Sequence, residues 1–277
     1  MYLKTMYQPV INAVIKSQPQ QVLMSQESNA VNIKSGQLLG RSGLEHMLEG
    51  CAPTPELSAS SVYIRPGPFE PFLESGGAEG LAWWERLRLM GRSVLNSDTG
   101  IVALRGGSSA LVVVPPFPIS ESRLIHEWDL SPLRALLAAE HTVGVILLRL
   151  GRFSVAVYQG ERLLSSKTNA RYVKGRHHAG GTSQLRFQRI REGQAQKLYQ
   201  KTCQAVQSQF SAYPALDFIV LGGDRFTLDG FLKECTYLQR WRDKILEHRL
   251  NIRDPKRDTL EGVGRILTSS RIYPLEW

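Results

Sequence analysis

The chain has 277 residues, of which 42% are hydrophobic and 21% charged, and its formal net charge is +9. This length fits two domains of ordinary size, or one with an extension, and the apolar content excludes a wholly disordered chain. The sequence has no run of about 18 apolar residues, so we expect no membrane span. Its first residues lack the charged-then-apolar pattern of a secretory signal, which indicates a cytoplasmic protein.

The three cysteines, Cys51, Cys203 and Cys235, are widely separated and odd in number. This pattern predicts no disulfide framework, and no Cys-x-x-Cys pair offers a zinc site. We interpret each cysteine as a small buried hydrophobic residue. The sequence therefore predicts neither a metal nor another cofactor.

The first 130 residues divide into two segments. Residues 1–50 are rich in Gln, Ser and Asn, so we expect a loosely packed or poorly ordered segment with a short helix near its start. Residues 51–130 predict a small α+β domain of unknown role. Its expected elements are a strand over 61–65, a helix over 81–95 and a hairpin of strands 100–104 and 110–114. The apolar residues of the helix that fall mostly on one side are Leu81, Trp84, Leu87, Leu89 and Val94.

Residues 131–277 predict a second domain, which opens with a helix at Ser131-Pro132. Apolar and alternating patterns then predict a meander of three antiparallel strands, a long amphipathic helix, a buried strand and two further helices. Their expected ranges are 143–150, 153–158, 161–165, 185–210, 217–221, 227–235 and 238–248. The fold class is therefore α/β, or α+β overall, with helices packed on a mixed sheet.

The positive charge is concentrated in one segment. Residues 165–201 contain nine Lys or Arg and a single acid, Glu192, so this segment carries a charge of +8. A solvated surface normally mixes signs, whereas a one-signed block predicts a polyanionic partner, most commonly nucleic acid.

A glycine-containing loop lies inside this block and runs Lys174-Gly-Arg-His-His-Ala-Gly-Gly-Thr-Ser-Gln184. Glycines let a ligand approach the main chain closely, and the following helix would present free N–H groups to an anion, with Thr182 or Ser183 as its cap. The loop has neither the Gly-Lys-Ser/Thr ending of a phosphate-binding loop nor the Gly-x-Gly-x-x-Gly dinucleotide pattern. A plain strand-to-helix connection is the alternative interpretation.

This loop, with Arg186-Phe187 after it, resembles the catalytic loop of the Vms-like release factors, in their bacterial branch. That family includes the ankyrin-repeat and zinc-finger peptidyl-tRNA hydrolase and is related to the central domain of the eukaryotic and archaeal release factor. The resemblance implies an RNase H-like domain that hydrolyses peptidyl-tRNA on the large ribosomal subunit. The Gly-Gly-Gln of the release factor is here split into Gly180-Gly181-Thr182-Ser183-Gln184, and no zinc finger or ankyrin repeat is present.

The resemblance also implies roles for individual residues. Gln184 would place a water against the ester carbonyl, by positioning and oxyanion stabilisation rather than proton abstraction, while the glycines let the loop enter the peptidyl-transferase centre. Side chains expected to contact ribosomal RNA and the tRNA are Arg171, Lys174, Arg176, His177, His178, Arg186, Arg189 and Arg191.

Three other interpretations remain. A triad of His177 or His178 with Ser183 and Asp217 or Asp224 has no supporting spacing or Gly-x-Ser-x-Gly turn. A metal nuclease would need clustered carboxylates, which the sequence does not show. A binding factor that keeps the fold and the basic face without hydrolysis is the non-enzymatic alternative.

Overall fold

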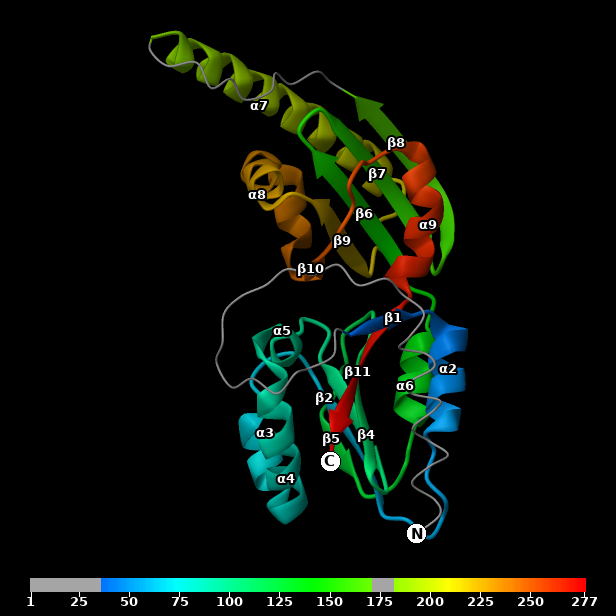
Figure 1. Cartoon of the computed structure of the whole chain (residues 1–277). Helices are drawn as coiled ribbons and strands as arrows, with labels where there is room; N and C mark the ends of the chain where they lie inside the picture. Colours follow the sequence, from blue (N-terminus) through cyan, green and yellow to red (C-terminus); the bar gives the residue numbers. More distant parts are fainter. Residues whose placement is uncertain (1–35, 171–181) are drawn as a thin grey trace. The chain divides into compact units, whose positions relative to one another are not determined.

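The structure is a computed structural model, and it describes residues 36–170 and 182–277. The chain forms two compact units: one runs through Leu137 and includes Ser269–Trp277, and the other is Ala138–Thr268 (Figure 1). This division differs from the boundary expected at residue 130. The C-terminal residues belong to the first unit, because their strand pairs inside its sheet. No helix in the described residues is long and apolar enough to cross a membrane.

The first unit is built on a six-stranded sheet in the order β1-β11-β4-β3-β2-β5. Its neighbouring strands pair antiparallel. The predicted hairpin is present as β3 and β4, and it turns at Gly107, whose φ of 61° suits glycine. The strands are β1 (Gln37–Leu39), β2 (Ala59–Ile64), β3 (Ile101–Gly106), β4 (Ser109–Val114), β5 (Arg123–Ile125) and β11 (Ser270–Glu276).

Helices cover both faces of this sheet. One face packs against α2 (Arg41–Gly50) and α6 (Ser131–Ala138), and the other against the helices between β2 and β3 (Figure 1). The strands are apolar on both sides, so Val102 and Leu104 enter one core and Ala103 the other. The helices between β2 and β3 are α3 (Glu70–Ser75), α4 (Gly77–Leu87), the 3-10 turn η1 (Arg88–Met90) and α5 (Arg92–Leu95).

Two expectations for this unit are wrong. Residues 36–50 are not loosely packed, since Leu44 and Leu48 of α2 are fully buried. The helix expected over 81–95 starts at Gly77 and ends at Leu87, and its buried side is only partly the expected one. Leu87 and Val94 are buried as expected, but Leu81 and Leu89 are 47% and 45% exposed, and Trp83 is buried instead.

The second unit has the predicted mixed sheet, in the order β10-β9-β6-β7-β8. Strands β6, β7 and β8 form the expected antiparallel meander, while β9 runs parallel to β6 and β10 parallel to β9. The strands are β6 (Thr142–Arg149), β7 (Arg152–Gln159), β8 (Arg162–Ala170), β9 (Phe218–Gly223) and β10 (Ile245–Leu250).

Helices α7 (Thr182–Phe210) and α8 (Arg225–Glu234), with the 3-10 helix η2 (Thr236–Lys244), cover one face of this sheet. Phe210 closes the core against Gly144, where an added Cβ would lie 2.6 Å from the ring. Helix α9 (Arg257–Leu267) lies on the other face, where the hydroxyl of Tyr158 donates to the carbonyl of Leu260 at 2.7 Å.

The helix expected over 238–248 is wrong in its second half. Residues 236–244 form η2, and 245–250 form strand β10 at the edge of the sheet. The polar run Glu247-His248-Arg249 is exposed there, so its mixed composition fits a solvated edge strand as well as a helix surface.

The cysteine expectation also needs correction. Cys203 of α7 and Cys235, which follows α8, form a disulfide across a sequence separation of 32 residues, with 5.4 Å between their Cα atoms. Both sulfurs lie at the core that α7 and α8 share, whereas Cys51 is a free thiol. Sequence spacing could not show this pair, because the two residues meet only when the helices pack side by side.

Candidate RNA-contacting site

The sheet of the second unit places the start of the basic loop at one end of its strands. Ala170, the last residue of β8, pairs with Arg152, which in turn pairs with Arg149 at the end of β6. Gly223 at the end of β9 is level with Leu148. The chain therefore leaves β8 at the edge where the three mutually parallel strands β6, β8 and β9 end, and it re-enters the described structure at Thr182 as α7.

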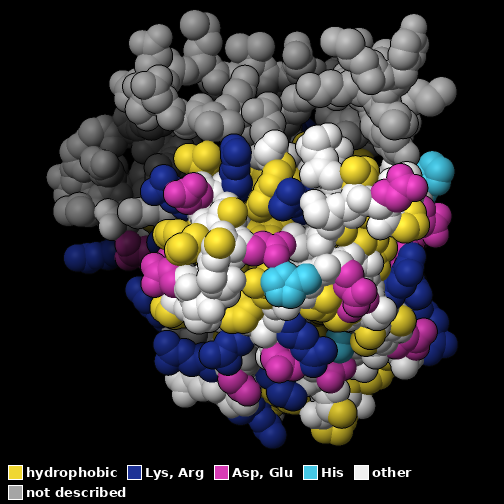
Figure 2. Space-filling model, turned by 90° about the horizontal axis from the view of Figure 1, so that it is seen from below, with side chains coloured by type: hydrophobic (Ala, Val, Ile, Leu, Met, Phe, Trp, Pro, Cys, Tyr) yellow, Lys and Arg dark blue, Asp and Glu magenta, His cyan; other side chains and the backbone are white. Residues whose placement is uncertain are grey.

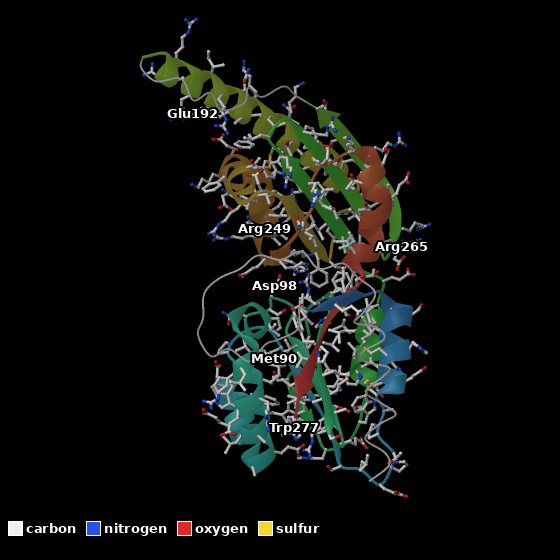
Figure 3. All side chains as sticks on the ribbon, viewed as in Figure 1. Met90, Asp98, Glu192, Arg249, Arg265 and Trp277 are labelled. Atoms are coloured by element: carbon white, nitrogen blue, oxygen red, sulfur yellow. A yellow bond between two sulfur atoms is a disulfide. The ribbon has the colours of Figure 1, made fainter. Side chains whose placement is uncertain are left out.

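Helix α7 extends well beyond the sheet. It has 29 residues, yet among its described side chains, from Arg186 onward, the first that is fully buried is Leu198. Arg186, Arg189 and Ile190 are exposed on the half that precedes Leu198, and the projecting half carries Glu192, labelled in Figure 3. The helix is therefore an arm whose C-terminal half packs on the core, while Arg186, Gln188, Arg189 and Ile190 are open to a partner.

One face of this arm carries four cations and no acidic residue. At 100° per residue, Arg186, Arg189, Lys197 and Lys201 fall within an arc of about 120°. The buried residues Leu198, Thr202, Ala205, Val206 and Phe210 occupy the opposite side. We call these four cations the basic face of α7.

The basic face is not neutralised by its own unit. None of its four side chains forms an ion pair with an acid among the residues that the structure describes, and Glu192 instead accepts a hydrogen bond from Gln188 at 2.9 Å. The face of the molecule in Figure 2 differs, because its Lys and Arg are interspersed with Asp and Glu. Unpaired cations held on a rigid helix are suited to contact successive phosphates.

Arg191 is directed differently from the other two predicted arginines. It is only half-exposed, and at 100° per residue it falls between Ala205 and Val206 on the buried side of the helix. Arg191 is therefore not part of the basic face of α7. On the same helix, burial raises the pKa of Tyr199, Asp224 and Glu234 raise it further, and Arg191 opposes them.

The predicted catalytic residues fall at the boundary of the described structure. Thr182, Ser183 and Gln184 are the first three residues of α7, so the helix begins three residues earlier than expected. The other predicted loop residues lie outside the described residues: Arg171, Lys174, Arg176, His177, His178, Gly180 and Gly181.

The acids considered for a triad have structural roles. Asp217 accepts a hydrogen bond from the backbone of Thr142 at 2.8 Å, at the start of β9 and thus at the end of the sheet opposite to the loop. Asp224 caps α8 by accepting from the backbone of Thr227 at 2.9 Å. Over residues 36–170 and 182–277, no group of three His, Cys, Asp or Glu side chains could hold a metal ion.

The sequence did not identify several polar residues near the ends of the parallel strands. Arg149 donates to the carbonyl of Ile252 at 3.0 Å, and Arg152 holds both carboxylate oxygens of Asp254 at 3.0 and 3.1 Å. These bonds tie the segment after β10 across the strand ends. No sequence signal identifies them, because the partners are about 100 residues apart.

A protein family matches a range that includes most of the second unit. Residues 141–273 match the family described as the Actinobacteria/chloroflexi VLRF1 release factor. Most of the second unit is thus similar to a release factor, and we call Ala138–Thr268 the release-factor-like domain.

Two individual relatives are peptide chain release factors. The chain is 29% identical over 174 residues to peptide chain release factor subunit 1 of Methanopyrus kandleri, which covers 58% of this chain and 41% of the relative. It is 31% identical over 137 residues to the same factor of Pyrobaculum aerophilum, covering 49% and 35%. The chain thus spans about two-fifths of the length of these curated relatives.

A comparison with solved structures gives a match with a low TM-score. The crystal structure of the archaeal translation termination factor aRF1 covers 76% of this chain and 64% of its own, at 13% identity and a TM-score of 0.30. Because that score is low, the description of the release-factor-like domain rests on the sequence matches and on its own topology.

Proposed function

We propose that this protein is a peptidyl-tRNA hydrolase of the Vms-like release-factor type, which acts in ribosome rescue on the large ribosomal subunit. The observation that carries the proposal is the Gly180-Gly181-Thr182-Ser183-Gln184 sequence at the start of the basic arm of a release-factor-like domain. The strand order of the sheet, a three-stranded meander extended by two parallel strands, supports an RNase H-like arrangement.

The proposed reaction is hydrolysis of an ester. The oxygen of a water forms a bond to the ester carbonyl carbon, and the bond from that carbon to the 3′ oxygen of the tRNA then breaks. The products are a peptide carboxylic acid and a tRNA 3′ hydroxyl, which takes up the proton that the water loses. Gln184 orients the water and stabilises the developing oxyanion, because an amide is too weak a base to remove a proton.

The arm supports this assignment through its geometry. Gln184 lies in the first turn of α7, about 14 residues before Leu198, the first of the described side chains that is fully buried. At 1.5 Å per residue, this spacing places Gln184 about 20 Å along the helix axis from Leu198. Such a reach suits a group that acts inside a narrow ribosomal tunnel, while the basic face of α7 contacts RNA along the way.

The test is release of labelled peptide from peptidyl-tRNA on isolated large subunits, comparing wild type with Gln184→Ala. Loss of one positioned donor should lower the rate about a hundredfold or more. Gln188→Ala is the matched control, since Gln188 is one turn further along the helix and bonds to Glu192. We expect the control to release peptide within about twofold of wild type.

The same assay separates the two candidate functions. If wild type binds the subunit in a salt-sensitive way but releases no peptide, the hydrolase proposal is wrong, and a non-catalytic RNA-binding factor remains. The unpaired basic face of α7 is the observation that favours this second function, because it supports RNA binding whether or not Gln184 is catalytic. Equal loss of release in both glutamine variants would also refute the assigned role of Gln184.

A further inference from the structure

The most exposed large apolar side chain in the described structure lies on α8. Phe226 is 88% exposed, whereas the other exposed apolar side chains are between 38% and 51% exposed. It follows Arg225, whose side chain is 83% exposed, at the start of the helix. An exposed aromatic beside an exposed arginine is a pair of groups that contacts single-stranded nucleic acid, through base stacking and phosphate binding.

Nothing within α8 covers this ring. Gly230 is one turn further along the same side of the helix, and it has no side chain to pack on the phenyl group. Asp229, at the i+3 position, is bound at 3.5 Å by Arg225 and at 3.0 Å by Arg249 of β10. The ring therefore has no apolar neighbour at either of the two helical positions that could shield it.

The position of Phe226 connects it with the basic arm. Tyr199 of α7 contacts Gly230 and Phe231, and one turn further along both helices Cys203 is bonded to Cys235. The contacts advance in the same direction along both helices, so α7 and α8 run parallel. Phe226, four residues before Gly230, therefore lies level with the part of α7 that precedes Tyr199.

The cation beside Phe226 that is available to a phosphate is Arg225. Two arginines, Arg225 and Arg249, and two acids, Asp224 and Asp229, lie in this region. Asp224 caps α8, and Asp229 is bound at 3.0 Å by Arg249 but only at 3.5 Å by Arg225. Because the side chain of Arg225 is 83% exposed and forms the longer ion pair, it can bind the phosphate of a nucleotide that stacks on Phe226.

We propose that Phe226 stacks on an unpaired RNA base while Arg225 binds the phosphate of the same nucleotide, forming a second RNA contact beside the basic face of α7. This inference rests on the proposed function, because the RNA is that of the ribosomal complex. Its occupant is a single flipped-out or single-stranded nucleotide. Stacking needs a flat π face, which Trp provides and Leu does not.

The experiment measures equilibrium binding of the full chain to isolated large subunits carrying peptidyl-tRNA, over a series of salt concentrations. Phe226→Ala and Phe226→Leu should each weaken binding about fivefold to a hundredfold, whereas Phe226→Trp should stay within about twofold of wild type. The slope of log K against log salt should not change in these variants, because stacking releases no counterions. Ile266→Ala, at a 38% exposed site on the other face of the sheet, is the control and should bind normally.

Two results would overturn the proposal. If Phe226→Leu binds like wild type while Phe226→Ala does not, the ring makes an apolar contact with protein. If neither variant weakens binding, the ring has no role in the complex. Failure of the hydrolase proposal gives a different result, because wild type would then release no peptide while the binding differences among the Phe226 variants persisted.

Discussion

The basic face of α7 gives a quantitative prediction of salt dependence. Replacing both Arg186 and Arg189 with Gln keeps long polar side chains on an exposed helix and removes two cations that have no acidic partner among the described residues. Each phosphate contact contributes about 0.7 to 0.9 to the slope of log K against log salt. The double variant should therefore lower the steepness of that slope by about 1.4 to 1.8, and the affinity advantage of wild type should be greatest at low salt.

The assay is binding of the full chain to isolated large subunits at several salt concentrations between about 50 and 200 mM. Arg162→Gln is the matched control, because Arg162 is at the other end of β8 and donates to Gln159 at 3.0 Å. We expect the control to keep the wild-type slope. An unchanged slope in the double variant would show that the face does not contact phosphates, and the reasoning from unpaired cations would then be wrong.

Two further predictions concern the core of the release-factor-like domain. The Cys203–Cys235 disulfide closes a loop of 32 residues, so Cys203→Ser should lower the free energy of unfolding under oxidising conditions by about 3 to 4 kcal/mol, as measured by denaturant titration. Cys51→Ser, which removes a free thiol, should leave it within about 1 kcal/mol, and equal effects of the two changes would refute the bond. Gly144→Ala places a Cβ 2.6 Å from the ring of Phe210 and should lower the melting temperature at a cost of about 1 to 3 kcal/mol. The control is Gly193→Ala, where an added Cβ meets nothing within 4 Å, and it should not lower the melting temperature. If Gly144→Ala melts at the wild-type temperature, the core around Phe210 is looser than the structure indicates.

Local sequence patterns were sufficient to predict those strands and turns whose characteristic residues are consecutive in the chain. The strands β6, β7 and β9 are apolar on both faces, because helices cover both sides of the sheet, and such runs are readable without a fold. The glycine-containing turn between two apolar runs predicts the hairpin β3–β4. The one-signed charge of residues 165–201 likewise indicated a polyanion partner, because charge is a property of the sequence itself.

Partners far apart in the sequence were decided only by the tertiary structure. Strand β11 pairs with β1 and β4, so the last residues belong to the first unit although they follow the second in the chain. The disulfide and the bonds of Arg149 and Arg152 depend in the same way on which helices and strands pack together. Pairing of this kind leaves no periodic signal, since each contact joins one residue to another that local propensity cannot identify.

The features of the candidate site also fall into these two groups. The sequence by itself supplied the glycine loop, Gln184 and the basic block, because residue identity and spacing carry that information. Only the fold showed that Arg186 and Arg189 are exposed on the part of α7 that precedes Leu198, whereas Arg191 is half-buried. Only the fold left Phe226 exposed at the start of α8, because exposure depends on what packs against a side chain and not on the side chain itself.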